Sequence, residues 1–155
     1  MNYHNVIIDL LHYILNKPDE YRVYLESGNA YDKIIRNYHQ FNYKGEKVYR
    51  NKNRILNHYR FTEDAWKVRN KMTSLYYEHL IPIKIIKDDL IKSNKTIQSI
   101  TKILNDNEII VLTKSQALEL DKEYKSTIPK NGISRLDIMN YKIEQSTQNN
   151  TLWKK

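Results

Sequence analysis

The chain has 155 residues and a formal net charge of +8. A chain of this length buries roughly 68 to 70% of the surface that its unfolded form exposes, so it needs neither a metal nor a disulfide to fold. It contains no cysteine, which excludes a disulfide framework, a thiolate zinc site and a cysteine nucleophile. The N-terminus has no cationic segment and Asp9 interrupts the first apolar run. We therefore expect no signal peptide, no membrane span and a cytoplasmic location.

The positive charge is concentrated in residues 44–71, which contain nine basic and three acidic residues. Such a field favours a nucleic acid or an acidic protein surface as partner, because both can exchange bound counterions for these cations. The composition is rich in Ile, Asn, Lys and Tyr and has three glycines. That bias is associated with AT-rich genomes and their mobile elements.

Helical periodicity dominates the first third of the chain. Apolar residues recur at three- and four-residue spacing over residues 3–16, and further helices are expected over residues 18–26 and 30–41. Residues 44–60 are the least regular part, with Val48-Tyr49 readable as a short strand. The first part of the chain thus predicts a layer of helices.

The remaining elements are predicted from caps, prolines and short apolar runs. Thr62 can cap a helix with an acidic first turn, and Thr113 with Gln116 has the spacing of a capping box. Helices are expected over residues 83–91, 96–104, 113–126 and 135–141, and strands over residues 76–81, 109–113 and 141–143.

These elements predict an α+β fold. We expect a mostly helical single domain over residues 1–143, with a small antiparallel sheet of two or three strands. Residues 144–155 are polar apart from Leu152-Trp153 and are expected to form a loosely ordered tail.

The motif Glu78-His79-x-x-Pro82 resembles the opening of HNH-type nucleases, in which a histidine at the end of the first strand is the general base. Asn107-Glu-Ile-Ile-Val-Leu-Thr113 resembles the second strand and its preceding asparagine. A looser likeness continues through Ile128-Pro129 and residues 135–143. The resemblance covers about the second half of the chain and implies catalytic roles for His79, Glu78 and Asn107.

The same resemblance implies a metal-binding histidine in the helix after the second strand. Here the matching residues are Ser115-Gln116-Ala117-Leu118, and no histidine follows His79. The ligands left for Mg²⁺ or Mn²⁺ under this interpretation are Glu78, Glu119 and Asp121. The incomplete ligand set favours a structural role for His79 over catalysis, with no metal or other cofactor.

A second constellation lies in the basic stretch, where cations alternate with aromatic rings. The candidate partner-binding residues are Lys47, Tyr49, Arg50, Lys52, Arg54, Tyr59 and Arg60. Tyrosine and arginine are the residue types that anchor protein interfaces, and the chain has 13 tyrosines. The alternative is a solvated basic loop.

A small, basic, tyrosine-rich chain without a complete active site is similar to the anti-CRISPR proteins of phages and other mobile elements. The similarity is one of size and composition, and it points to those that act on type II effector nucleases. It implies a non-enzymatic inhibitor that binds such an effector, or its guide-RNA complex, without a cofactor. A basic surface favours binding to the nuclease domain, which blocks the conformational change needed for cleavage, over mimicry of DNA. The alternative is a degenerate HNH-type metal-dependent endonuclease, or a DNA-binding protein that uses residues 44–71; no membrane partner is expected.

Overall fold

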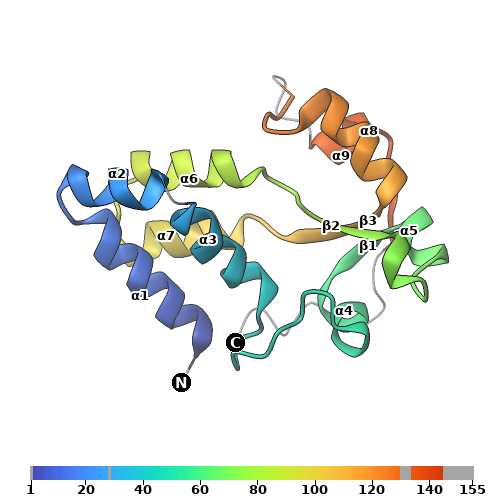
Figure 1. Cartoon of the computed structure of the whole chain (residues 1–155), viewed down its shortest axis with the longest axis horizontal. Helices are drawn as coiled ribbons and strands as arrows, with labels where there is room; N and C mark the ends of the chain where they lie inside the picture. Colours follow the sequence, from blue (N-terminus) through green and yellow to red (C-terminus); the bar gives the residue numbers. More distant parts are fainter. Residues whose placement is uncertain (1, 28, 130–133, 145–155) are drawn as a thin grey trace. The chain divides into compact units, whose positions relative to one another are not determined.

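The computed structural model describes residues 2–27, 29–129 and 134–144. The fold is α+β and mostly helical, as predicted. The helical share is 59%, and the described residues contain nine α-helices and one mixed four-stranded sheet (Figure 1). The chain forms two compact units. The helical unit comprises Met1–Lys47 and Ile83–Asn107, and the sheet unit comprises Val48–Pro82 and Glu108–Lys155. Most of the predicted tail, residues 145–155, lies outside the described residues.

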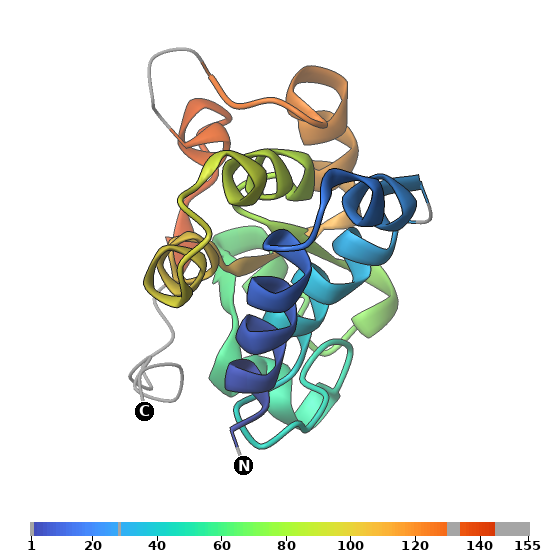
Figure 2. The same cartoon turned by 90° about the vertical axis from the view of Figure 1, so that its left-hand side faces the viewer.

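The helical unit is built from helices that the apolar periodicity predicts. They are α1 (Tyr3–Leu15), α2 (Asp19–Ser27), α3 (Ala30–Gln40), α6 (Ile83–Lys92) and α7 (Ile97–Asn105). The Asn2 side chain caps α1 by accepting a hydrogen bond from the backbone N–H of His4 at 3.0 Å. Helix α1 packs on α3 and α7, and α3 packs on α6; Figure 2 shows α1 in front of α3. The longest helix, α1, has 13 residues, and no described helix has the length and apolarity needed to cross a membrane.

The sheet unit contains four strands. They are β1 (Arg60–Thr62), β2 (Leu75–His79), β3 (Ile109–Thr113) and β4 (Ile143–Glu144), in the order β2-β3-β1-β4. Strand β2 is antiparallel to β3, β1 is parallel to β3, and β4 is antiparallel to β1. The predicted antiparallel sheet of two or three strands is therefore corrected to a mixed sheet of four. The sequence prediction missed β1 because three residues show no strand periodicity and their pairing with β3 is distant in sequence.

Strand β3 divides the core of the sheet unit into two apolar clusters. Val111 lies in one cluster with Ile55 and Phe61, and Ile110 lies in the other with Leu120. Successive side chains of a strand point to opposite faces, so each cluster covers one face of the sheet. The helices of this unit are α4 (Lys52–His58), α5 (Glu63–Lys67), the 3₁₀ helix η1 (Met72–Ser74), α8 (Lys114–Tyr124) and α9 (Arg135–Ile138).

The strand-strand-helix layout predicted from the nuclease-like motif is present as β2, β3 and α8. Residues Ile83–Asn107, which lie between β2 and β3 in sequence, form α6 and α7 of the helical unit. The capping box of Thr113 and Gln116 opens α8 as predicted. The layout thus contains a long insertion between its two strands.

Candidate functional site

The carboxylate of Glu78, the first residue of the nuclease-like motif, is the counter-ion of a buried arginine. Glu78 Oε1 accepts a hydrogen bond from Nη2 of Arg135, whose exposed fraction is 0%. Arg135 also donates to the backbone carbonyls of His79, Leu80 at 3.2 Å and Tyr124 at 2.9 Å. One guanidinium therefore joins the end of β2, the end of α8 and the start of α9. A buried guanidinium needs a carboxylate partner, so this geometry gives Glu78 a structural role.

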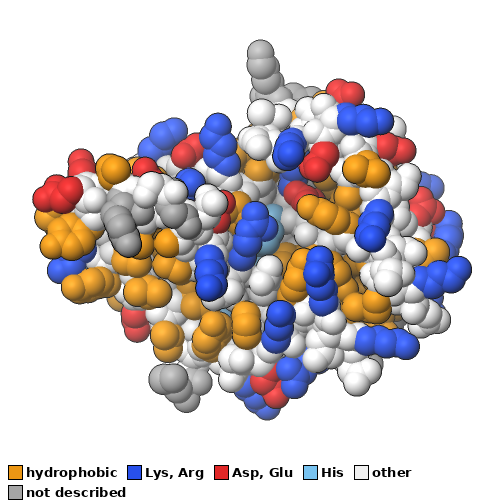
Figure 3. Space-filling view, in the orientation of Figure 1, with side chains coloured by type: hydrophobic (Ala, Val, Ile, Leu, Met, Phe, Trp, Pro, Cys, Tyr) orange, Lys and Arg blue, Asp and Glu red, His pale blue; other side chains and the backbone are white. Residues whose placement is uncertain are grey.

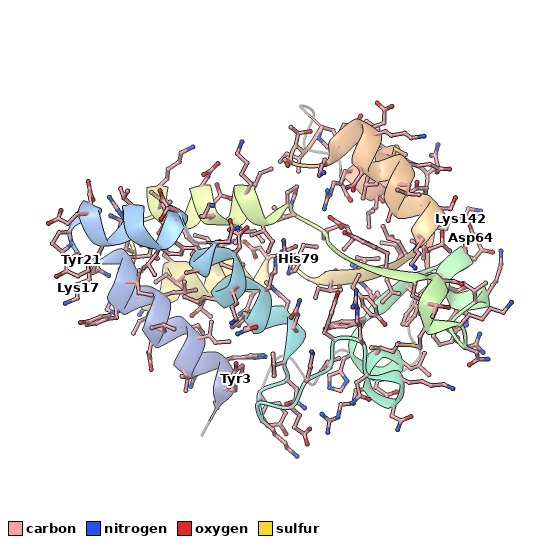
Figure 4. The ribbon with its side chains drawn as sticks, in the orientation of Figure 1. Tyr3, Lys17, Tyr21, Asp64, His79 and Lys142 are labelled. Carbon is pink, nitrogen blue, oxygen red and sulfur yellow. The ribbon has the colours of Figure 1, made fainter. Side chains whose placement is uncertain are left out.

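His79 occupies the last position of β2, where the sheet register pairs it with Ile109. Only 4% of its surface is exposed. Figure 4 labels His79. A general base must come within hydrogen-bond distance of the water that it deprotonates, with the substrate beside it. The imidazole of His79 is buried in the protein instead of lining a site open to solvent.

Asn107, the third residue of the catalytic interpretation, belongs to the helical unit. It is buried, and its backbone N–H donates to the carbonyl oxygen of Leu104 at 3.3 Å. The imidazole of His39 forms hydrogen bonds with backbone groups of Leu104 and Asn107. Asn107 thus takes part in the interior packing of the helical unit.

The carboxylates proposed as ligands of Mg²⁺ or Mn²⁺ do not converge on one site. Glu119 on α8 accepts a hydrogen bond from the hydroxyl of Tyr141 at 2.9 Å, and burial together with this carboxylate raises the pKa of Tyr141. Asp121 lies two residues further along α8, a spacing that puts two helical side chains on different faces. Among the residues that the structure describes, no group of three or more His, Asp or Glu side chains is placed to hold a metal ion. The structure therefore does not bring Glu78, Glu119 and Asp121 together.

Tyr49, Arg50 and Tyr59 of the basic stretch form a cluster with Tyr77 of β2 on the sheet unit. The ring centroid of Tyr77 lies 4.8 Å from that of Tyr49 and 6.0 Å from that of Tyr59. The guanidinium of Arg50 lies over the ring of Tyr49, at 5.0 Å from its centroid. Tyr59 is 3% exposed, and burial raises its pKa; burial raises the pKa of Tyr77 to about 12. Tyr59 therefore supports the cluster from inside the unit, while Tyr49 and Arg50 lie nearer the surface.

Helix α4 places further cations beside this cluster. Asn51 caps the helix by accepting a hydrogen bond from the backbone N–H of Asn53 at 3.1 Å. Lys52 is exposed in the first turn, and Arg54 follows two residues later and is half-buried. We call the surface formed by Tyr49, Arg50, Lys52 and Arg54 the α4 surface.

The other two predicted partner-binding residues lie elsewhere. Nε of Arg60 donates to Oε2 of Glu108 at 3.0 Å, and this hydrogen bond raises the pKa of Arg60. The charge of Arg60 is thus balanced within the sheet unit. Lys47 belongs to the helical unit, where it pairs with Phe41 in an isolated antiparallel bridge.

A polar pocket of about 520 Å³ lies between α5, the start of α8 and the turn before β4, and the sequence did not predict it. It is lined by Glu63, Asp64, Thr113, Ser115, Gln116, Glu119, Met139, Asn140, Tyr141 and Lys142; Figure 4 labels Asp64 and Lys142. Gln116 holds the wall together, because Oε1 accepts from the hydroxyl of Thr62 at 2.8 Å and from the backbone N–H of Thr113 at 3.1 Å. Lys67 forms ion pairs with Glu63 at 3.4 Å and with Asp64 at 3.2 Å.

Sequence reasoning also missed the role of Arg135. A weak signal exists, since a strand residue such as Glu78 can be buried only with a cationic partner. The chain offers 26 basic residues as that partner, and nothing in the sequence singles out Arg135.

Comparisons with known proteins do not indicate a function for this chain, so a functional assignment depends on the residues described above. No protein-family model, no curated protein and no solved structure matches the chain.

Proposed function

We propose that the chain is a non-catalytic cytoplasmic binding protein that uses its α4 surface to bind an acidic patch on a partner protein. The observation that carries the proposal is the contrast between the two candidate sites. Glu78 is the counter-ion of buried Arg135 and His79 is buried, whereas Arg50 and Lys52 are exposed. The nuclease-like motif thus supports the fold, and the basic stretch is the part available to a partner.

A protein partner suits the α4 surface better than DNA does. The surface has three cations, Arg50, Lys52 and Arg54, on a short segment. Affinity for DNA grows with the number of phosphates that the protein neutralises, and three cations neutralise few of them. Tyrosine and arginine are, by contrast, the usual anchors of protein interfaces, and Tyr49 with Arg50 forms such a pair.

The resemblance to anti-CRISPR proteins supplies the identity of the partner in this proposal. The chain binds the nuclease domain of a guide-loaded type II effector and holds it away from the position in which it cleaves DNA. Cations of the α4 surface face carboxylates of the effector, which speeds association and determines the orientation of the complex. Inhibition by this route requires no metal and no chemical step.

The test is a binding titration of the full chain with a purified, guide-loaded type II effector. The variant is Arg50→Asp/Lys52→Glu/Arg54→Glu. Arg50 has φ 57°, a left-handed conformation that Asp tolerates better than most residues, so the backbone is preserved. Tyr59 stays intact because its ring is buried in the core.

The matched control is Lys114→Glu/Lys122→Glu/Lys125→Glu, which makes the same change in charge at exposed positions of α8 and its C-terminal end. Loss of three close charge pairs predicts an affinity about a hundredfold lower for the α4 variant and little change for the control. Equal affinities for the two variants, or no binding by the unmodified chain, would contradict the proposal. Binding of free DNA that the α4 variant loses would replace the protein partner with nucleic acid.

A further inference from the structure

Helix α1 has a second apolar face that points away from its own core. Val6, Leu10 and Tyr13 are 41%, 43% and 61% exposed. Their spacing of four and three residues places them on one side of the helix, next to the buried face that contains Ile7, Leu11 and Ile14. We call this stripe the α1 face; Figure 3 shows exposed apolar side chains gathered over the region of α1 and α2.

One acidic residue, Asp9, lies on α1 within the stripe, and the other acidic residues of this part of the chain lie on α2. Residues 2–27 contain four acidic and two basic residues, although the whole chain has a net charge of +8. Asp9 is exposed and lies three residues after Val6 and four before Tyr13, so it falls within the stripe. Of the two basic residues, Lys17 lies over the ring of Tyr13 at 4.2 Å from its centroid, and Arg22 pairs with Asp19.

We propose that the α1 face docks an amphipathic helix of a partner protein, with apolar residues against Val6, Leu10 and Tyr13 and a lysine or arginine opposite Asp9. An apolar stripe with three-four spacing is the surface on which such helices pack. The carboxylate in the middle of the stripe selects a helix with a cation in register, because an uncompensated charge would lose its hydration inside the interface.

The same carboxylate argues against a second copy of the chain as the occupant. Two α1 faces related by a two-fold axis at the middle of the stripe bring Asp9 of one copy close to Asp9 of the other. Like charges at that position destabilise the pair. A basic helix therefore fits the α1 face better than another α1 does.

This inference goes beyond the proposed function and stands apart from it. The α1 face belongs to the helical unit and the α4 surface to the sheet unit, so each can be altered without touching the residues of the other. Failure of one proposal leaves the other intact.

The experiment uses two fluorescent synthetic peptides of about 18 residues, long enough to hold helical structure. Both carry the same leucine stripe, flanked by lysines in one peptide and by glutamates in the other. Fluorescence anisotropy follows their titration with the full-length chain. The expected result is that the lysine peptide binds about tenfold more tightly than the glutamate peptide.

Variants of the chain locate the site. Leu10→Glu is expected to abolish binding of the lysine peptide, and circular dichroism should show an intact fold because Leu10 is an exposed residue. Asp9→Lys should reverse the preference between the two peptides. Asp89→Lys, the same change at an exposed position of α6, should preserve it.

Three results would overturn the proposal. The first is equal affinity for the two peptides, and the second is the absence of binding by both. The third is a dimer of the unmodified chain in sedimentation that Leu10→Glu dissociates, which would make a second copy the occupant of the α1 face.

Discussion

Arg135 donates hydrogen bonds to acceptors on Glu78, His79, Leu80 and Tyr124 while its own side chain is fully buried. At the scale of single residues, this contact explains why a motif that resembles a catalytic one need not be catalytic. The carboxylate of Glu78 balances a charge that has no access to water. Nuclease-like spacing in the sequence and a structural ion pair in the fold are compatible, because the spacing does not specify what the carboxylate contacts.

Arg135→Met is expected to lower the free energy of unfolding by about 3 kcal/mol or more, because Glu78 is left as a mostly buried charge without its partner. Urea unfolding measures the change. Glu78→Gln/Arg135→Met should recover part of the loss, since a neutral amide replaces the unpaired carboxylate. A loss of less than about 1 kcal/mol for the single variant would show that Arg135 does not stabilise the sheet unit in this way.

Stability of the helical unit is expected to depend on pH through His39. Burial lowers the pKa of His39 to about 4 from the ordinary value of 6.5, and nearby His4 also has a lowered pKa because of burial. Between these pH values the unfolded chain binds more protons than the folded one. The stability gained from burying a neutral His39 is therefore fully present above pH 6.5 and is lost as the pH falls toward 4. The free energy of unfolding decreases by about 3 kcal/mol in total.

His39→Gln keeps a side chain that can donate to the carbonyl of Leu104 and removes the titration. Thermal unfolding followed by circular dichroism from pH 7 to pH 4 should be less sensitive to pH in this variant. His12→Gln on α1 is the control and should retain the dependence. An identical pH dependence for the unmodified chain and His39→Gln would contradict the assignment.

At the scale of elements, the sequence predicted what depends on local patterns. The helices around residues 3–16, 30–41 and 83–91 follow from apolar periodicity, and the capping box at Thr113 follows from side-chain chemistry. Strand β1 could not be predicted, because its three residues become a strand only through the distant partner β3. The expected helix after Thr62 ends at Lys67 with Val68 as its C-cap, and the apolar residues Met72 and Leu75 belong to η1 and β2.

The candidate site was predictable to a smaller extent. The position and the charge of the α4 surface could be inferred, because the cations and tyrosines lie close together in the sequence. The burial of Tyr59 and the pairing of Arg60 with Glu108 could not, since both depend on contacts between residues far apart in sequence. The pocket beside Gln116 could not be predicted from the sequence either, because three separate segments of the chain line it.

The capping box at the start of α8 gives a prediction at this scale. Gln116→Ala should destabilise the fold by about 2 kcal/mol, because it opens the box and removes the acceptor of the buried Thr62 hydroxyl. Thr113→Ala should cost about 1 kcal/mol, the usual value of a lost N-cap. Ser115→Ala, at an exposed neighbouring position, should change stability by less than about 0.5 kcal/mol in the same denaturant titration. Equal losses of stability for Gln116→Ala and Ser115→Ala would contradict the stabilising role of the Gln116 hydrogen bonds.

At the scale of the whole molecule, the positive charge is unevenly divided. The sheet unit has fifteen basic and nine acidic residues, and the helical unit has eleven and nine. The α4 surface lies in the more cationic unit, whereas the α1 face is apolar and has one carboxylate, Asp9, in its middle.

Binding through the α4 surface should weaken as salt is added. Raising the ionic strength from about 0.05 to about 0.5 M shortens the range of electrostatic attraction, so the association rate with the effector should fall by about tenfold or more. Surface plasmon resonance measures this rate directly. The Arg50→Asp/Lys52→Glu/Arg54→Glu variant should show a smaller dependence on salt, and a rate that is independent of salt would count against an electrostatic interface.

A plasmid-cleavage assay with Mg²⁺ or Mn²⁺ tests most directly whether the chain binds a nuclease or is one. The purified chain is assayed alone, and then added to a guide-loaded type II effector. We predict no cutting by the chain alone, and loss of effector cleavage that the Arg50→Asp/Lys52→Glu/Arg54→Glu variant no longer causes. Cutting by the chain alone that His79→Ala abolishes would contradict this account and establish the HNH-type nuclease in its place.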